Sequence, residues 1–158
     1  MEGLRLLFSG ILGALACGCA AQNSVDDIDL IEIRQSGPAS LDISISSDGR
    51  GSFSIEGVGP NEKGTFKLSE SEFRSFEKVL AEFRPEAVPR SDASVIEMLD
   101  RAYPEGVHSA TDRGAIYIRW IGAGVDDHYL ADLGCDWQRM ADRNARLRSI
   151  MAGMPIHL

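Results

Sequence analysis

Residues 41–56 read LDISISSDGRGSFSIE, and this stretch predicts a β-hairpin around which the domain is built. On each side of Asp48-Gly49, apolar residues alternate with polar ones, which is the pattern of a strand with one buried face. Asp-Gly is favoured in tight hairpin turns, where both turn positions require positive φ. The side chains expected on the buried face are Leu41, Ile43, Ile45, Phe53 and Ile55.

Strand-like patterns recur on both sides of this hairpin. A second hairpin is expected near the C-terminal end, where Gly122-Ala123-Gly124 can turn the chain. The further strand segments are residues 28–34, 65–68, 115–120 and 126–133. With the first hairpin, they predict an antiparallel sheet of about five to six strands.

A helix is expected directly after the fourth strand segment. Ser69 and Glu72 have the spacing of a capping box, in which each residue bonds the backbone N–H of the other. Apolar residues then recur every three or four positions up to Phe83, and Arg84-Pro85 ends the pattern. The sequence therefore predicts one amphipathic helix here.

A second main helix is expected near the C-terminus, with Asp136 as its cap and Trp137 and Leu147 on its apolar face. A shorter helix is expected at residues 93–102. An antiparallel sheet with two main helices packed on one face is an α+β domain.

Length and composition agree with one globular domain. The chain has 158 residues, of which 44% are hydrophobic and 25% charged, which excludes a wholly disordered chain and a collagen-like fibre. The net charge is −8. Nucleic acid is therefore not expected as a partner, because its binding relies on neutralising phosphates.

Residues 1–22 read MEGLRLLFSGILGALACGCAAQ and are organised as an export signal. Arg5 supplies a positive charge, and an uncharged run of 11 residues from Leu6 to Ala16 follows it. A membrane-spanning helix needs roughly 20 apolar residues, so this run has the length of a signal-peptide core. We expect a signal peptide at residues 1–18.

The end of this run, Ala16-Cys17-Gly18-Cys19, resembles the lipobox of bacterial lipoproteins, in which small residues precede the cysteine that becomes acylated. The resemblance implies acylation of Cys19, with Cys17 as the alternative site. It also implies several acyl chains, palmitate among them, which are enough for stable membrane anchoring. Ala20 is not the aspartate associated with inner-membrane retention, so the resemblance implies the outer membrane and a periplasm-facing domain.

An alternative remains open, because Ala14-Leu15-Ala16 also fits the cleavage rule for an ordinary secretory signal. That cleavage would give a soluble periplasmic or secreted protein. With lipidation, the chain divides into a signal peptide (1–18), a lipidated N-terminus and tether (19–27) and a single α+β domain (28–158). Cys135 is then the one thiol without lipid, so no internal disulfide framework is expected.

The densest cluster of possible acid–base or metal ligands is Asp126, Asp127 and His128, with Asp132 nearby. On a strand, Asp126, His128 and Asp132 share a face, but Asp126 and Asp132 lie roughly 20 Å apart. One metal ion cannot bind both, so the pattern favours a strand with a polar outer face. No metal site and no cofactor are expected, since the sequence has no HExxH, CxxC, GxSxG or P-loop motif, and its two early cysteines belong to the leader.

Cys135 is a candidate nucleophile, with His128 or His108 as its base. It comes where a strand meets the last helix, and a helix N-terminus can lower a thiol pKa. The competing interpretation is a small buried hydrophobic residue, the usual role of a free cysteine.

Two functional hypotheses follow. The first is a non-enzymatic envelope lipoprotein that binds an envelope protein, as an accessory or inhibitor-like module. A contiguous exposed apolar patch would favour it. The second is a periplasmic hydrolase, or a small-ligand or metal-binding protein, that uses the His128/Cys135 region. It requires at least two of these groups to meet in one pocket.

Overall fold

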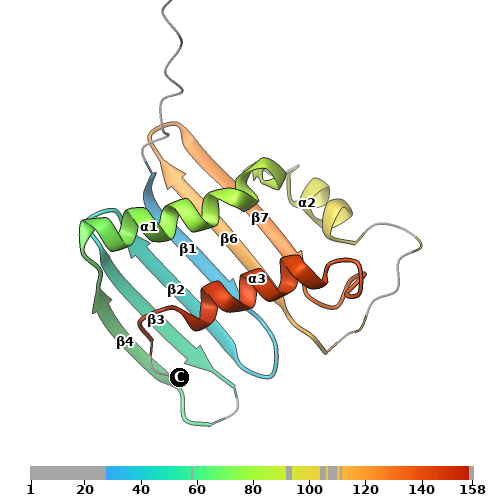
Figure 1. Cartoon of the computed structure of the whole chain (residues 1–158), viewed down its shortest axis with the longest axis horizontal. Helices are drawn as coiled ribbons and strands as arrows, with labels where there is room; N and C mark the ends of the chain where they lie inside the picture. The colour runs from blue at the N-terminus through green and yellow to red at the C-terminus, as the bar shows by residue number, and fades with distance from the viewer. Residues whose placement is uncertain are drawn as a thin grey trace, which may run out of the picture.

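The computed structural model describes residues 28–156, apart from residues 58, 92–93, 104–105, 107–109 and 111. Seven strands of the described residues form one antiparallel sheet in the order β4-β3-β2-β1-β6-β7-β5 (Figure 1). The strands are β1 (Ile28–Gln35), β2 (Ser40–Ser46), β3 (Arg50–Glu56), β4 (Glu62–Lys67), β5 (Val88–Pro89), β6 (Ala115–Gly122) and β7 (Val125–Asp132). The helices are α1 (Glu70–Leu80), the 3-10 helix η1 (Ala81–Glu86), α2 (Ser94–Ala102) and α3 (Ala141–Ala152).

The α+β class and the antiparallel sheet are as predicted, but the sheet has seven strands rather than five to six. The additional strand is β5, which lies between the helix expected to end at Arg84-Pro85 and the shorter helix expected at residues 93–102. Its two residues are too few to show alternation, and Pro89 is tolerated there because β5 is an edge strand.

The predicted hairpin is confirmed as β2 and β3, with Ile43 opposite Phe53 and Ile45 opposite Gly51. Its turn differs from the expectation that both Asp48 and Gly49 have positive φ. The loop has three residues, Ser47 to Gly49, and only Gly49 has positive φ, at 81°. This is the geometry of a three-residue hairpin loop that ends in a left-handed residue.

The two faces of the sheet have different chemistry. Ile31, Ile33, Ile118 and Trp120 are almost fully buried on one face and belong to the main hydrophobic core. Alternate residues of the same strands, such as Glu32 and Arg119, lie on the other face.

Helices α1 and α3 both cross the apolar face of the sheet (Figure 1). Phe73 and Leu80 of α1 and Leu147 and Ile150 of α3 belong to the same core cluster as the strand residues. The shorter α2 lies at the β7 side of the sheet instead. None of the helices in the described part of the chain is long and apolar enough to span a bilayer.

The two main helices begin differently. The capping box is confirmed: Ser69 Oγ accepts from Glu72 N, and the Glu72 carboxylate accepts from Ser69 N at 2.7 Å. The prediction that Asp136 caps the last helix is wrong, because α3 begins five residues later, at Ala141. Asp136 has a φ of 44° and starts the preceding turn, in which its carbonyl accepts from Met140 N.

Candidate functional site

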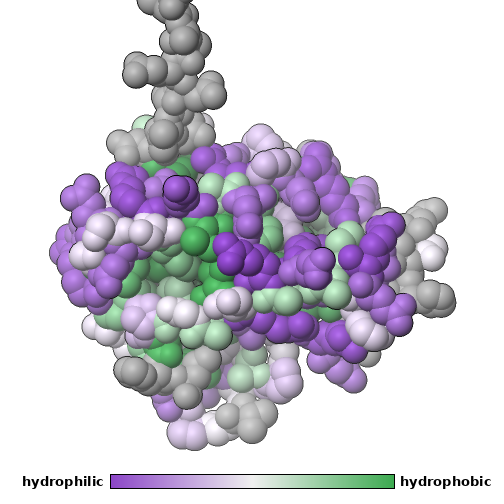
Figure 2. All heavy atoms as spheres, in the orientation of Figure 1, coloured by the Kyte–Doolittle hydropathy of each residue, from purple (hydrophilic) through white to green (hydrophobic). Residues whose placement is uncertain are grey.

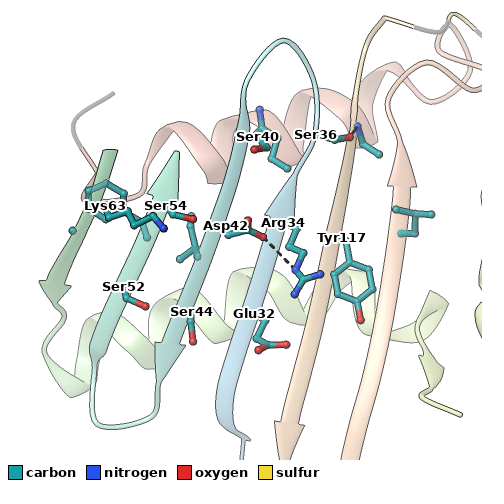
Figure 3. Close-up of a pocket in the computed structure, with 16 residues that line it drawn as sticks. Glu32, Arg34, Ser36, Ser40, Asp42, Ser44, Ser52, Ser54, Lys63 and Tyr117 are labelled. Carbon is teal, nitrogen blue, oxygen red and sulfur yellow. Dashed lines mark hydrogen bonds and ion pairs between the residues drawn. The ribbon is translucent and has the colours of Figure 1, made fainter. Parts of the chain in front are cut away.

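The open face of the sheet holds a hollow of about 820 Å³ across β4, β3, β2, β1 and β6 (Figure 3). Its floor includes Ser44, Ser52 and Ser54, whose side chains are short. Longer side chains stand on both sides, among them Lys63 on β4 and Tyr117 on β6. The hollow exists because small residues occupy the middle of a polar face.

Most of the charges near this hollow are paired. Arg34 Nε lies 3.2 Å from Asp42 Oδ1, as the dashed line in Figure 3 shows. Arg119 binds Glu32 at 3.0 Å and Asp126 at 2.7 Å, so one guanidinium joins β1, β6 and β7. Hydrogen bonds from Arg119 hold the pKa of Asp126 below its ordinary value. The carboxylates of Asp42, Glu32 and Asp126 on this face are therefore engaged in ion pairs.

His128 lies on the same face as Arg119, yet only 2% of it is exposed. Its Nε2 is 3.0 Å from Ser94 Oγ at the start of α2, and its Nδ1 is 3.3 Å from the Tyr117 hydroxyl. Burial lowers the pKa of His128, and the positive charge of Arg90 lowers it further. A neutral imidazole thus connects α2 to the sheet, with both ring nitrogens in use.

The acidic residues around His128 divide between the two faces of β7. Asp126 lies on the same face as His128, as the strand period predicts, and binds Arg119. Asp127 lies on the opposite face and binds Arg84 at 3.1 Å. Asp132 accepts from the backbone N–H groups that follow β7. Each carboxylate has its own structural partner, and the described residues contain no group of acidic, histidine and cysteine side chains that could hold a metal ion.

Cys135 is only 6% exposed. Burial raises the pKa of its thiol, and Asp132 and Asp136 add to the effect. Neither Cys135 nor His128 lines the open-face hollow. The thiol therefore has the environment of a structural cysteine, in which the reactive thiolate is disfavoured. Cys17, Cys19 and the other candidate base, His108, lie outside the described residues.

The exposed apolar side chains of the described residues gather on α2. Those of large size are Val95 (45%), Ile96 (65%), Leu99 (42%) and Tyr103 (45%), besides Trp137 (38%) further along the chain. The first four follow i, i+1, i+4 and i+8 and form one stripe along α2 and the residue after it, here named the α2 stripe. Trp137 is separate in sequence, with the Arg113 guanidinium 4.1 Å from its ring centre.

The apolar pattern of residues 93–102 predicts a short helix but does not show that its stripe is exposed. The available signal was the number of apolar residues: Val95, Ile96, Met98 and Leu99 point in more directions than one buried face of a nine-residue helix requires. Comparison of the chain with protein-family models and with curated proteins finds no match.

Proposed function

We propose that this chain is an exported, lipid-anchored lipoprotein of the bacterial cell envelope whose domain binds another protein without catalysis. The observation that carries the proposal is the α2 stripe, since large apolar side chains on one helix face are typical of a protein-binding surface. The alternative, a hydrolase or metal-binding protein, has less support, because His128 is engaged in structural hydrogen bonds and Cys135 is buried.

The spacing of the α2 stripe fits a partner with an apolar groove that accepts one helix face. Ile96, Leu99 and Tyr103 stand at i, i+3 and i+7, the anchor positions of helix-in-groove recognition. Complete burial of an aliphatic or aromatic side chain contributes about 1.5–3 kcal/mol. Three or four such anchors supply part of the free energy of binding, from which the cost of association is subtracted.

The polar contacts of α2 position the stripe before any partner arrives. Ser94 bonds His128, and Ser91 and Ser94 exchange hydrogen bonds at the start of the helix. Near the other end, Arg101 donates to the carbonyl of Glu86 at 3.2 Å. A helix already fixed to a rigid sheet loses less conformational freedom on binding than a free helix does.

The anchor part of the proposal rests on the sequence of the leader. Acylation at Cys19 leaves residues 20–27 as a tether, which at about 3.3 Å per residue reaches roughly 26 Å. The domain then works close to the membrane surface and meets envelope proteins there.

The partner hypothesis is tested by crosslinking and affinity purification of the tagged full-length chain from envelopes. The test variant carries Ile96→Arg and Leu99→Arg. A matched control carries Ala141→Arg and Ala145→Arg, which add the same charge to exposed positions of α3. We expect one stoichiometric protein that is captured by the wild type and the control and lost with the α2 variant. Equal capture by all three chains, or no partner at all, contradicts the proposal.

The anchor hypothesis is tested by mass spectrometry of the mature N-terminal peptide. An acylated peptide that begins at Cys19 is expected, and one that begins at Cys17 moves the site to the alternative cysteine. A peptide without lipid that begins after Ala16 shows secretion in soluble form instead.

A further inference from the structure

A groove runs between α1 and α3 on the helical side of the sheet, where Figure 2 shows apolar residues between the two helices. Two adjoining hollows form it, of about 320 and 330 Å³, and both are lined by Ser75, Phe76 and Gly153. The helices themselves are not packed closely against each other. Each hollow has the volume of a small ligand pocket, and together they make an elongated site.

The walls and the floor of the groove differ in chemistry. Ser71 and Ser75 stand one helical turn apart on the α1 side, and Ser149 and Gly153 have the same spacing on the α3 side. Such short side chains leave room between the helices. The apolar residues that line the groove are Leu68, Phe76, Val79, Ile150 and Met154. None of these five is among the large exposed side chains of the described residues, so the groove is a narrow opening onto the core.

The charged side chains that line the groove are already paired. The Glu72 carboxylate accepts from Ser69 N at 2.7 Å, and Arg146 Nε lies 2.9 Å from Glu82 Oε1. An occupant therefore meets mainly apolar contact between the helices. A long, thin apolar ligand fits this shape and chemistry better than a charged one, because a buried charge needs a partner.

The described part of the chain begins near one end of this groove. The carbonyl of Asp29, its second residue, accepts from Ser47 N in the β2–β3 loop at 2.8 Å. In the same loop, the carbonyl of Gly49 accepts from Leu68 N at 2.9 Å, and Leu68 lines the groove. The start of β1 and the groove are thus in contact with one three-residue loop.

We propose that the groove between α1 and α3 holds one acyl chain of the lipid at Cys19, folded back onto the domain by the tether of residues 20–27. Strands β1 and β4 lie three strand spacings apart, roughly 14 Å, and the tether reaches roughly 26 Å, so the lipid can enter beside Leu68. Each methylene group left in water costs free energy, and the groove covers the chain while the protein is away from a bilayer. This inference rests on the anchor part of the proposed function.

The first test measures whether the groove binds an acyl chain. The probe is palmitate below its micellar concentration, and the protein is the full-length chain with Cys17→Ala and Cys19→Ala, which carries no lipid of its own. Ser75→Phe and Gly153→Leu are added separately to fill the groove from α1 and from α3. Position 75 is exposed, and among the described residues a Cβ at Gly153 meets its nearest atoms at 3.5 Å, so both positions accept a side chain. Ser52→Phe is the control, because it adds the same ring to the open face.

We expect equilibrium dialysis to show one palmitate bound per chain. Each groove variant should weaken binding by about tenfold or more, the effect of excluding about two methylene groups from apolar contact. The control should bind as the unsubstituted chain does. Circular dichroism checks that the variants, which alter different helices, are folded. No binding of palmitate, or equal binding by all four chains, overturns the proposal.

The second test asks whether the occupant is the lipid of the same chain. Benzoylphenylalanine in place of Ser75 in the full-length chain is photoactivated in cells, and mass spectrometry identifies what it captures. We expect the acylated N-terminal peptide of this chain. Capture of only a phospholipid or another protein overturns the assignment to the chain's own lipid.

Failure of this inference and failure of the anchor hypothesis give different results. If the groove is not the site, the mature N-terminal peptide still carries lipid, but palmitate binding does not depend on Ser75 and Gly153. If the anchor hypothesis is wrong, the peptide has no lipid and the chain's own acyl group is excluded as occupant, whatever the dialysis shows.

Discussion

Helices α1 and α2 begin in a similar way, but α1 buries its apolar side chains and α2 exposes them. Each begins with a pair of residues three positions apart, Ser69/Glu72 for α1 and Ser91/Ser94 for α2. In each pair, the side chain of one residue accepts a hydrogen bond from the backbone N–H of the other. Helix α1 then buries Phe73 and Leu80 against the sheet, with 0% and 1% of these side chains exposed. Helix α2 leaves the α2 stripe in solvent, and the only buried residue of α2 is Ser94.

The difference follows from position. Helix α1 crosses the middle of the apolar face, whereas α2 lies at the β7 side, where β5 adds only two residues to the sheet (Figure 1). Figure 2 shows polar residues over most of the outer surface of α1, with apolar residues visible between α1 and α3. Amphipathicity alone therefore does not reveal which face of a helix is buried. Whether the apolar face of a helix is buried depends on whether the helix lies over the apolar surface of the sheet.

Phe73→Ala should have the largest effect on the free energy of unfolding. Truncating a fully buried phenylalanine leaves a cavity in the main core, and the expected cost is about 3–5 kcal/mol. Denaturant unfolding followed by circular dichroism measures it. A cost below about 1 kcal/mol would mean that α1 does not pack as described, and the contrast with α2 would disappear.

The polar attachment of α2 predicts an effect of intermediate size. His128→Gln should cost about 1–3 kcal/mol at neutral pH, since Ser94 and Tyr117 lose the imidazole as a partner. Hydrogen exchange should report faster opening in α2 than in α1. Unchanged exchange in α2 would show that His128 does not hold this helix.

His128 also makes stability depend on pH. Its folded-state pKa lies below the ordinary value of 6.5, so the unfolded chain binds the proton more readily. The stabilisation is present above pH 6.5 and is lost as pH falls from there through the lower folded pKa, by at most about 1.4 kcal/mol per pH unit. The charged groups that act on the ring are Arg90, Arg119, Asp126 and Asp127. The His128→Gln chain should lack this component, and identical pH profiles would contradict it.

Removing the cap of α1 should have a smaller effect. Ser69→Ala deletes the acceptor for Glu72 N and leaves one N-terminal N–H without its side-chain partner. The expected loss is about 1 kcal/mol. Glu72→Gln is the matched control, because glutamine retains the reciprocal bond to Ser69 N, and it should cost less than Ser69→Ala. The reverse order would show that the charge of Glu72 near the helix N-terminus matters more than the capping geometry.

The sequence predicts the parts of this fold that depend on neighbours along the chain. Alternation identified β2 and β3, and the Ser69/Glu72 pair identified the start of α1. The two-residue β5 was missed because its partner, β7, lies far along the chain and its pairing involves only Val88 and Pro89. The start of α3 was misplaced because Asp136, a good capping residue, instead adopts a left-handed turn conformation.

The candidate site was less predictable for the same reason. Strand period correctly put Asp126 and His128 on one face, but no local pattern shows that α2 covers His128 or that Arg119 takes up Asp126. The α2 stripe depends on which elements meet at the β7 side of the sheet. These contacts belong to the tertiary structure, so the chemistry of single residues does not predict them.

The smallest effect on the free energy of unfolding is expected at Ile96, the most exposed residue of the α2 stripe. Ile96 is 65% exposed, so Ile96→Ala removes little buried surface, and alanine has the higher helix propensity. The free energy of unfolding should stay within about 0.5 kcal/mol of the wild-type value, with a slight gain favoured. A loss above 1 kcal/mol would mean that Ile96 is packed in the isolated protein, and α2 would then be a second core helix like α1. An unchanged stability together with weaker partner capture is the combination that only a docking residue produces, because a core residue cannot be truncated without cost.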